Sequence, residues 1–103
     1  MMSLLRIVVY AEPPNRWTAQ AIECDLMAWG ATRHAALDTL LKLVEVHVAF
    51  DGRQGTDPLS RFAPAPQMCW ERFATAAAAE APLELTPSDR PTDLRYLVAT
   101  SVG

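Results

Sequence analysis

An amphipathic stretch of about twenty residues after Thr32 constrains the fold of this chain most strongly. Its apolar side chains recur three, four, seven and eleven positions after the first, which is the spacing of one helical face. Thr32 precedes it as an expected N-cap, and Asp38 and Lys42 can pair across one turn. The apolar face comprises Leu37, Leu40, Leu41, Val44 and Val48, and the polar face comprises Arg33, Asp38, Lys42, Glu45 and Asp51. We expect this helix to pack its apolar face on a sheet.

The segments before this helix predict that sheet. Residues 4–12 are rich in β-branched and apolar side chains, and residues 16–24 resume the pattern after a Pro-Pro-Asn turn. The turn predicts a hairpin loop of several residues. A third strand is expected over residues 26–29, ended by Gly30, where the chain needs freedom to reverse. Three antiparallel strands follow from these patterns.

The second half of the chain contains a Pro-rich loop and a shorter helix. Residues 51–65 concentrate Gly, Pro and polar side chains, and residues 66–80 combine an N-terminal Pro66 with an apolar stripe and an alanine run. Pro82, Pro87 and Pro91 should then break regular structure before a last strand at about 94–100. The predicted fold class is therefore α+β, with an antiparallel three- to four-stranded sheet, helices packed on one face, and the order βββααβ.

Length and charge narrow the class of protein. The chain has 103 residues, half of them apolar, which is enough for one hydrophobic core, so we expect a single domain over residues 1–103. A net charge of −3 disfavours binding to nucleic acid through its phosphates. The N-terminal apolar run is short and contains Arg6, so it is typical of a strand rather than a signal peptide. No segment approaches the length of a membrane span, and we expect a cytoplasmic protein.

Residues 17–48 resemble the core of the HicB-like antitoxin domain. The matching order is a hairpin strand, an acidic residue before a short third strand, a glycine, and a Thr that opens a helix. The residues that carry it are Trp17, Ala19, Asp25, Gly30, Thr32, Ala36 and Leu37. The resemblance covers residues 4–50, and a Pro-rich helix entry extends it to about residue 75.

The resemblance implies a partial RNase H-like fold that oligomerises and neutralises a small basic HicA toxin, which cleaves messenger RNA. Many members add a C-terminal DNA-binding segment. After residue 80 this sequence has a Pro-spaced loop and one strand, with no basic or helical pattern for such a segment. We therefore expect a short form of the family without direct nucleic-acid binding.

Candidate catalytic groups are sparse. Glu23 and Asp25 would share a face if the chain there is extended, but two carboxylates without a third ligand seldom hold a divalent metal. We interpret them as an acidic patch for a basic partner. His34 and His47 are thirteen residues apart on one helix, too far to share a metal, and His34 can meet Asp38 instead.

Cysteines and glycines add no catalytic site. Cys24 and Cys69 lack metal-binding spacing and are expected to be buried, and the Gly-rich segment at residues 52–55 lacks the lysine of a phosphate loop. We predict no enzyme, catalytic residue, metal or cofactor.

Trp17, Trp29 and Trp70 are candidates for interface anchors, although core packing is the default for tryptophan. With Glu23 and Asp25, Trp17 and Trp29 form the predicted partner-binding set. A sheet covered by helices on one face leaves the other face to be protected, so we expect a homodimer or higher homo-oligomer.

Three functions remain open at this point. The first is an interaction protein that blocks a small basic toxin. The second is a stand-alone oligomeric scaffolding or ligand-binding protein without a toxin partner. The third is a nuclease remnant, which has the least support because carboxylates at metal-binding positions are few.

Overall fold

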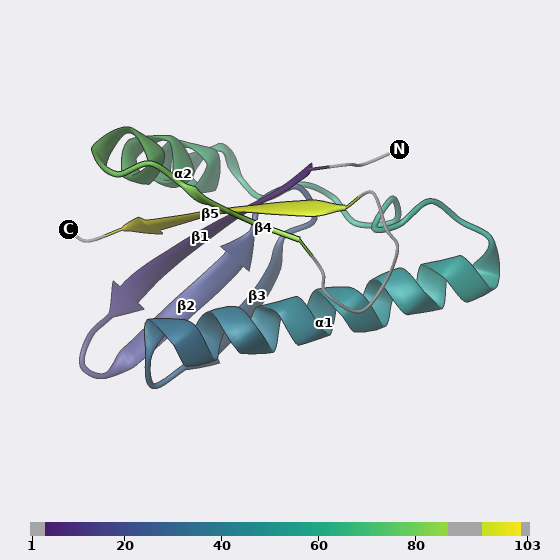
Figure 1. Ribbon diagram of the computed structural model, residues 1–103, viewed down its shortest axis with the longest axis horizontal. Coiled ribbons are helices and arrows are strands. Elements are labelled where there is room, and N and C mark those ends of the chain that lie inside the picture. The colour runs from purple at the N-terminus through teal and green to yellow at the C-terminus, as the bar shows by residue number, and fades with distance from the viewer. Residues whose placement is uncertain (1–3, 87–93, 102–103) are drawn as a thin grey trace.

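The structure is a computed structural model that describes residues 4–86 and 94–101, and its elements are labelled in Figure 1. Three strands come first, then two helices, then two strands. Their bounds are β1 (Leu4–Glu12), β2 (Arg16–Ala21), β3 (Leu26–Gly30), α1 (Arg33–Gln54), α2 (Gln67–Ala79), β4 (Leu83–Leu85) and β5 (Arg95–Ser101). The predicted hairpin, third strand, two helices and last strand are all present. The predicted order βββααβ lacks β4, whose three residues are too few to produce a strand pattern in the sequence.

The sheet has five strands in the order β3-β2-β1-β5-β4. The pairs β1–β2, β2–β3 and β4–β5 are antiparallel, and β1–β5 is parallel. The prediction of a purely antiparallel sheet of three or four strands is therefore wrong. A parallel neighbour requires a long crossover connection, and the chain between β1 and β5, which contains both helices, supplies it.

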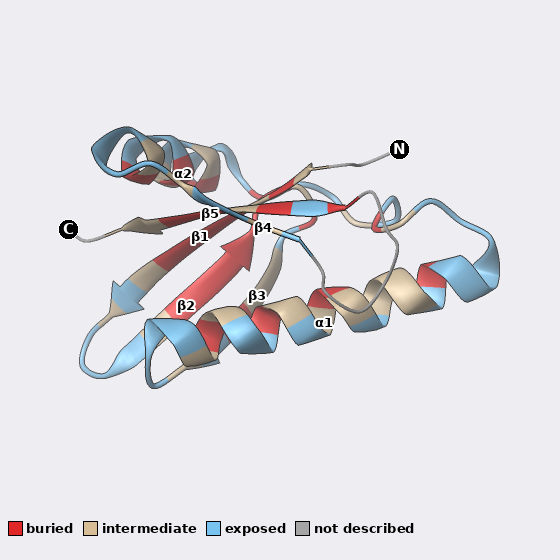
Figure 2. Cartoon of the chain, viewed as in Figure 1, coloured by how far each residue is buried: buried red, intermediate tan, exposed pale blue. Residues whose placement is uncertain are grey.

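The helices lie on opposite faces of the sheet, as Figure 1 shows, and the prediction that both pack on one face is wrong. Helix α1 packs against β3, β2 and β1, whereas α2 packs against β5 and β1. The central strand β1 explains this arrangement, because Ile7, Val8 and Val9 are all buried although successive side chains point to opposite faces. Figure 2 shows that buried residues are concentrated on β1 and the strands on either side of it, β2 and β5. A strand with both faces apolar needs cover on both sides.

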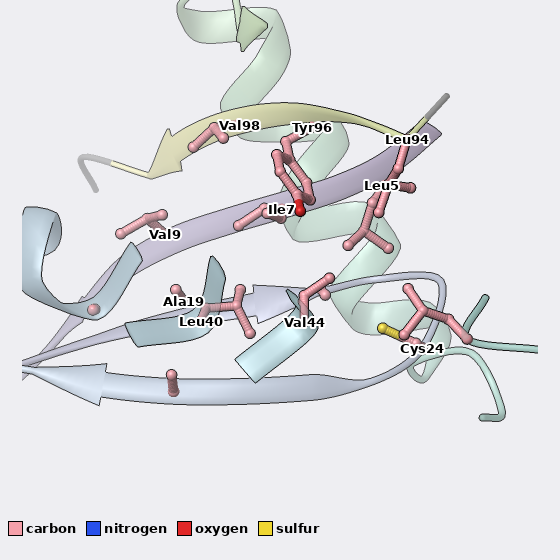
Figure 3. Close-up of a cluster of buried hydrophobic side chains, with 14 residues drawn as sticks. Leu5, Ile7, Val9, Ala19, Cys24, Leu40, Val44, Leu94, Tyr96 and Val98 are labelled. Carbon is pink, nitrogen blue, oxygen red and sulfur yellow. The ribbon is translucent and has the colours of Figure 1, made fainter. Parts of the chain in front are cut away.

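Each face has its own core. On the α1 face, shown in Figure 3, side chains from β1, β2, β5 and α1 meet, including Ile7, Leu40, Val44, Tyr96 and Val98. The α2 face has a smaller cluster, which contains Val8, Ile22, Ala65, Cys69, Phe73, Ala76 and Ala99. Both predicted buried cysteines are buried and free, Cys24 in the α1-face core and Cys69 on the buried face of α2.

Helix α1 begins as predicted and ends later than predicted. The Thr32 hydroxyl oxygen accepts a hydrogen bond from the Ala35 amide at 3.0 Å, and Asp38 pairs with Lys42 at 3.1 Å. The helix continues to Gln54 and stops at Gly55, which takes a left-handed conformation with φ of 71°. The predicted loop from residue 51 therefore starts four residues too early.

Asp51 was expected on the water-facing side of α1, and that expectation is wrong. Its side chain is 1% exposed. The carboxylate accepts hydrogen bonds from the Leu59 amide and from Nε of Arg61, each at 2.7 Å. The loop after α1 folds back over the last helical turns, so a polar position becomes the anchor of that loop.

The second half otherwise follows the sequence pattern. Helix α2 begins at Gln67, one residue after the predicted start, with Pro66 as its N-cap, and Pro82 directly precedes the short strand β4. Pro87 and Pro91, which were expected to break regular structure, lie outside the described residues.

Candidate interaction surface

The face of the sheet that carries α2 is only half covered. Among the described residues, no Cα atom of α2 lies within 8 Å of β2 or β3. The strand register places two cross-strand pairs on the half that α2 does not reach, Thr18 with Trp29 and Gln20 with Met27. Neighbouring side chains bury Thr18 and Gln20, and Trp29 is exposed. We call these four residues, together with Arg16, the open half-face. It lies on the same face of the sheet as Val8 and Tyr10 of β1.

Trp29 is the most prominent side chain of the open half-face. It is 50% exposed, and the guanidinium of Arg16 lies over its ring, 5.6 Å from the centroid. Arg16 is held in turn by Glu12 at 2.8 Å, and Glu12 also accepts a hydrogen bond from the Thr18 hydroxyl. These hydrogen bonds, from Thr18 first and then Arg16, lower the pKa of Glu12 below its ordinary value. The indole is thus supported on one side by a fixed set of charges.

The other end of the open half-face is polar. Gln20 is 3% exposed, and its Nε2 donates a hydrogen bond to Oδ1 of Asp25 at 2.8 Å. The Gln20 Oε1 atom is buried and has no hydrogen-bond partner within the described structure. An unsatisfied buried acceptor is costly, so this amide is a point at which a donor from another molecule would be stabilising.

Glu23 and Asp25 do not share a face, because the chain at these residues is not extended as the prediction required. Both lie in the turn between β2 and β3, and Asp25 has a positive φ of 54°. Asp25 is exposed beside the open half-face. Glu23 instead accepts a hydrogen bond from the Arg6 amide at 2.7 Å and forms an ion pair with the Arg6 guanidinium, leaving its side chain 13% exposed. Glu23 therefore stabilises the turn, and its charge is already compensated.

Trp17 lies on the opposite face of the sheet. Its register partners are Ala11 and Gly30, and its ring packs partly buried against the α1-face core. The four predicted partner-binding residues are thus divided, because only Asp25 and Trp29 lie together at the open half-face. Arg16 and Met27 were not predicted as partner-binding residues, although strict strand alternation around Trp29 identifies both once the register is known.

The histidines and cysteines show no catalytic arrangement. The expected contact between His34 and Asp38 is absent from the described residues, where Asp38 pairs with Lys42. His47 is half-buried and lies edge-on to Phe62 with the centroids 4.9 Å apart. Burial raises the pKa of the Cys24 thiol to about 11, which makes it a poor nucleophile at neutral pH. Within residues 4–86 and 94–101, no three His, Cys, Asp or Glu side chains gather as a metal site.

Comparisons with known proteins give no relative for this chain: no family model, no curated protein and no solved structure matches it. A search of the described helices for one long and apolar enough to cross a membrane finds none.

Proposed function

We propose that this chain is a non-enzymatic protein-interaction domain of the HicB-like type, which binds and neutralises a small basic HicA-like toxin in the cytoplasm. The observation that carries the proposal is the half-exposed Trp29 at the open half-face, with the exposed carboxylate of Asp25 at the other end of the same strand. Exposed aromatic residues are the commonest anchors of protein interfaces. The net charge of −3 favours a basic partner through long-range attraction.

We further propose that the domain is a partial RNase H-like fold. In support of this, three antiparallel strands are followed by α1 and later by β5, which lies beside β1 and runs parallel to it. The domain would thus resemble a nuclease in topology while acting by binding. Neutralisation then requires that the bound chain covers the surface with which the toxin holds its RNA, and no bond is made or broken.

The proposed docking uses two contacts. A lysine or arginine of the partner pairs with Asp25, whose Oδ1 atom is already positioned by Gln20. An apolar or cationic side chain of the partner packs on the exposed side of the Trp29 ring, opposite Arg16. The first contact makes binding sensitive to salt, and the second supplies most of its affinity.

Co-expression with any small basic protein that is encoded beside this chain tests the proposal. We expect the two proteins to copurify and this chain to rescue growth from that neighbour's toxicity. Trp29→Ala and Asp25→Lys should each raise the dissociation constant about tenfold or more. Leu83→Ala, which alters a 59% exposed residue on the other edge strand, should leave binding unchanged. Failure of the neighbour to copurify, together with no rescue, would refute the antitoxin role.

The second candidate is a stand-alone oligomeric scaffolding protein with no toxin partner. The observation that favours it is the unprotected outer edge of β3, which offers a surface for self-association without any other protein. It becomes the better account if no neighbouring basic protein binds while the chain alone still associates.

A further inference from the structure

The two edges of the sheet differ in how well they are protected against pairing with another strand. The β4 edge is only three residues long, directly follows Pro82, and carries Glu84, which pairs with Arg95 at 3.5 Å. Short strands, charges and nearby prolines are the usual means by which proteins block edge pairing. The β4 edge is therefore poorly suited to bind another chain.

The β3 edge has none of these protections. Its five residues, Leu-Met-Ala-Trp-Gly, contain no charge and no proline. Its pairing with β2 runs without interruption through all five residues, so no bulge twists the edge away. No backbone hydrogen bond from a loop of the described structure reaches residues 26–30. This edge leaves its outer amides and carbonyls available for a further strand.

We propose that β3 pairs with β3 of a second copy of this chain, antiparallel and about a two-fold axis at Ala28. The two five-stranded sheets then form one continuous sheet of ten strands. A two-fold axis at Ala28 pairs this residue with Ala28 of the second copy. All other residue pairs between the two strands are then fixed, because one known pair determines the register of an antiparallel ladder.

This register makes the exposed side chains complementary. Met27 lies opposite Trp29 of the second copy on the open half-face, and Trp29 lies opposite the second copy's Met27. A thioether against an indole is a favourable contact, and both indoles lose solvent-exposed area. On the other face of the sheet, Leu26 lies opposite the second copy's Gly30, beside the first turn of that copy's α1, which approaches Gly30 closely. No two charged residues are paired within the ladder.

Charges complement each other at both ends of the ladder. Asp25 lies in the turn directly before β3, which puts it at the end of the ladder, near Ala31 of the second copy. In that copy, extending the β2–β3 register by one residue pairs Arg16 of β2 with Ala31. Arg16 of the second copy is therefore in the same cross-strand row as Asp25 of the first copy and on the same face of the sheet. Asp25 of each copy and Arg16 of the other are thus aligned for an ion pair, and symmetry supplies two of them.

The unsatisfied amide of Gln20 lies in one of these rows. Gln20 is paired with Met27, so the proposed register extends that row to Trp29 of the second copy. The second copy thereby adds a side chain with an indole N–H donor to the row that contains Gln20. Self-association would therefore place a donor near a group that lacks one in the monomer.

The proposed interface is small. A five-residue edge and two indoles bury less than the roughly 1,600 Å² of a typical stable interface, so we expect a dissociation constant on the order of 10 µM. Sedimentation velocity of the full chain between about 1 and 200 µM should show a reversible monomer–dimer equilibrium. A chain that stays monomeric at the highest concentration overturns the proposal.

A matched pair of variants locates the interface. Met27→Lys places a charge at the centre of the proposed interface and should raise the dissociation constant at least tenfold. Met68→Lys makes the same change on α2, at a side chain that is 64% exposed, and should leave the equilibrium unchanged. Equal effects of the two variants would show that the β3 edge is not the contact.

Charge reversal tests the register itself. Arg16→Glu alone and Asp25→Arg alone each place like charges opposite one another, and each should weaken dimerisation. An equimolar mixture of the two variants should recover a heterodimer, because one ion pair is then restored with its signs exchanged and the other is the original pair of Asp25 with Arg16. Thermal unfolding confirms that each variant is folded. Two folded variants that do not associate when mixed would rule out this register.

The inference does not depend on the proposed toxin partner. The sedimentation experiments use this chain alone, so their failure leaves the binding experiment with the basic neighbour intact. If both proposals hold, the partner and the second copy compete for Trp29, and adding the partner should convert the homodimer into a complex with a single copy of this chain.

Discussion

Asp51 is the residue whose role depends most on tertiary structure. The Arg61 side chain and the Leu59 amide donate hydrogen bonds to its carboxylate and lower its pKa from the ordinary value of 3.8. Replacing the acid by an amide puts a donor where an acceptor is needed. We expect Asp51→Asn to lower the free energy of unfolding by about 2 kcal/mol in urea denaturation at pH 7.

The acid dependence of stability provides a second measurement on Asp51. Because the folded state lowers its pKa, its contribution is present above pH 3.8 and is lost as the pH falls through the folded value. The Asp51→Asn variant should therefore lose less stability than the wild type between pH 5 and pH 2. Asp57→Asn, an exposed change in the same loop, should behave like the wild type. An identical acid profile for all three proteins would contradict this role.

Gly30 is required for a reason other than the one expected from the sequence. It was expected to provide conformational freedom, but the constraint is the close approach of α1. A Cβ atom at residue 30 would lie 2.6 Å from the Ala36 amide nitrogen and 2.9 Å from the Ala35 Cβ atom. We expect Gly30→Ala to destabilise the fold by about 1 to 3 kcal/mol, measured by urea unfolding.

Gly52 provides the matched control for that substitution. It lies near the end of α1, and a Cβ atom there meets nothing within 4 Å. Gly52→Ala should therefore stabilise the protein by about 0.5 to 1 kcal/mol through helix propensity. If Gly30→Ala proved neutral, the packing of α1 on β3 would have to be looser than described.

At the scale of elements, the first turn of α1 depends on Thr32. Its hydroxyl oxygen accepts from the Ala35 amide, which otherwise has no partner within the helix. Thr32→Ala should cost about 1 kcal/mol in thermal or urea unfolding. Thr39→Ala changes the same residue type at an exposed position inside α1 and should be neutral or slightly stabilising. Comparable losses in both variants would mean that the hydroxyl does not act as a cap.

Local patterns predicted the elements well where the pattern is periodic or the turn chemistry is specific. The hairpin, the third strand, both helices and the last strand depend on neighbours within a few residues, and the sequence contains that information. Strand β4 and the parallel pairing of β5 do not, because a three-residue strand has no period and pairing depends on the path between strands. The same limit applies to Glu23, whose partner Arg6 is seventeen residues away.

The candidate site was half predicted for a similar reason. Trp29 and Asp25 were identified by residue type, and the structure brings them to one surface. Trp17 was named with them as a partner-binding residue, and the strand register places it on the other face of the sheet, against the α1-face core. The α2 helix covers only β1 and β5 of the second face, and no local pattern in the sequence encodes that placement.

At the scale of the whole molecule, two cores share one sheet. Adjacent residues of β1 and β5 alternate between them, with Val9 and Val98 in the α1-face core and Val8 and Ala99 in the α2-face core. Loss of packing on either face therefore loosens strands that the other face requires. Such sharing predicts one cooperative unfolding transition rather than separate melting of α2.

Core truncations on the two faces test this coupling. Leu40→Ala on the buried face of α1 should cost about 2 to 5 kcal/mol, and Phe73→Ala on the buried face of α2 about 3 to 5 kcal/mol. In both variants circular dichroism and tryptophan fluorescence should report the same urea midpoint. Val46→Ala, at a 64% exposed position on α1, should change stability by less than about 0.5 kcal/mol. Hydrogen exchange distinguishes the alternatives, because in Phe73→Ala the amides of α1 should lose protection together with those of α2. If α2 alone lost protection, the α1-face core would be an independent folding unit.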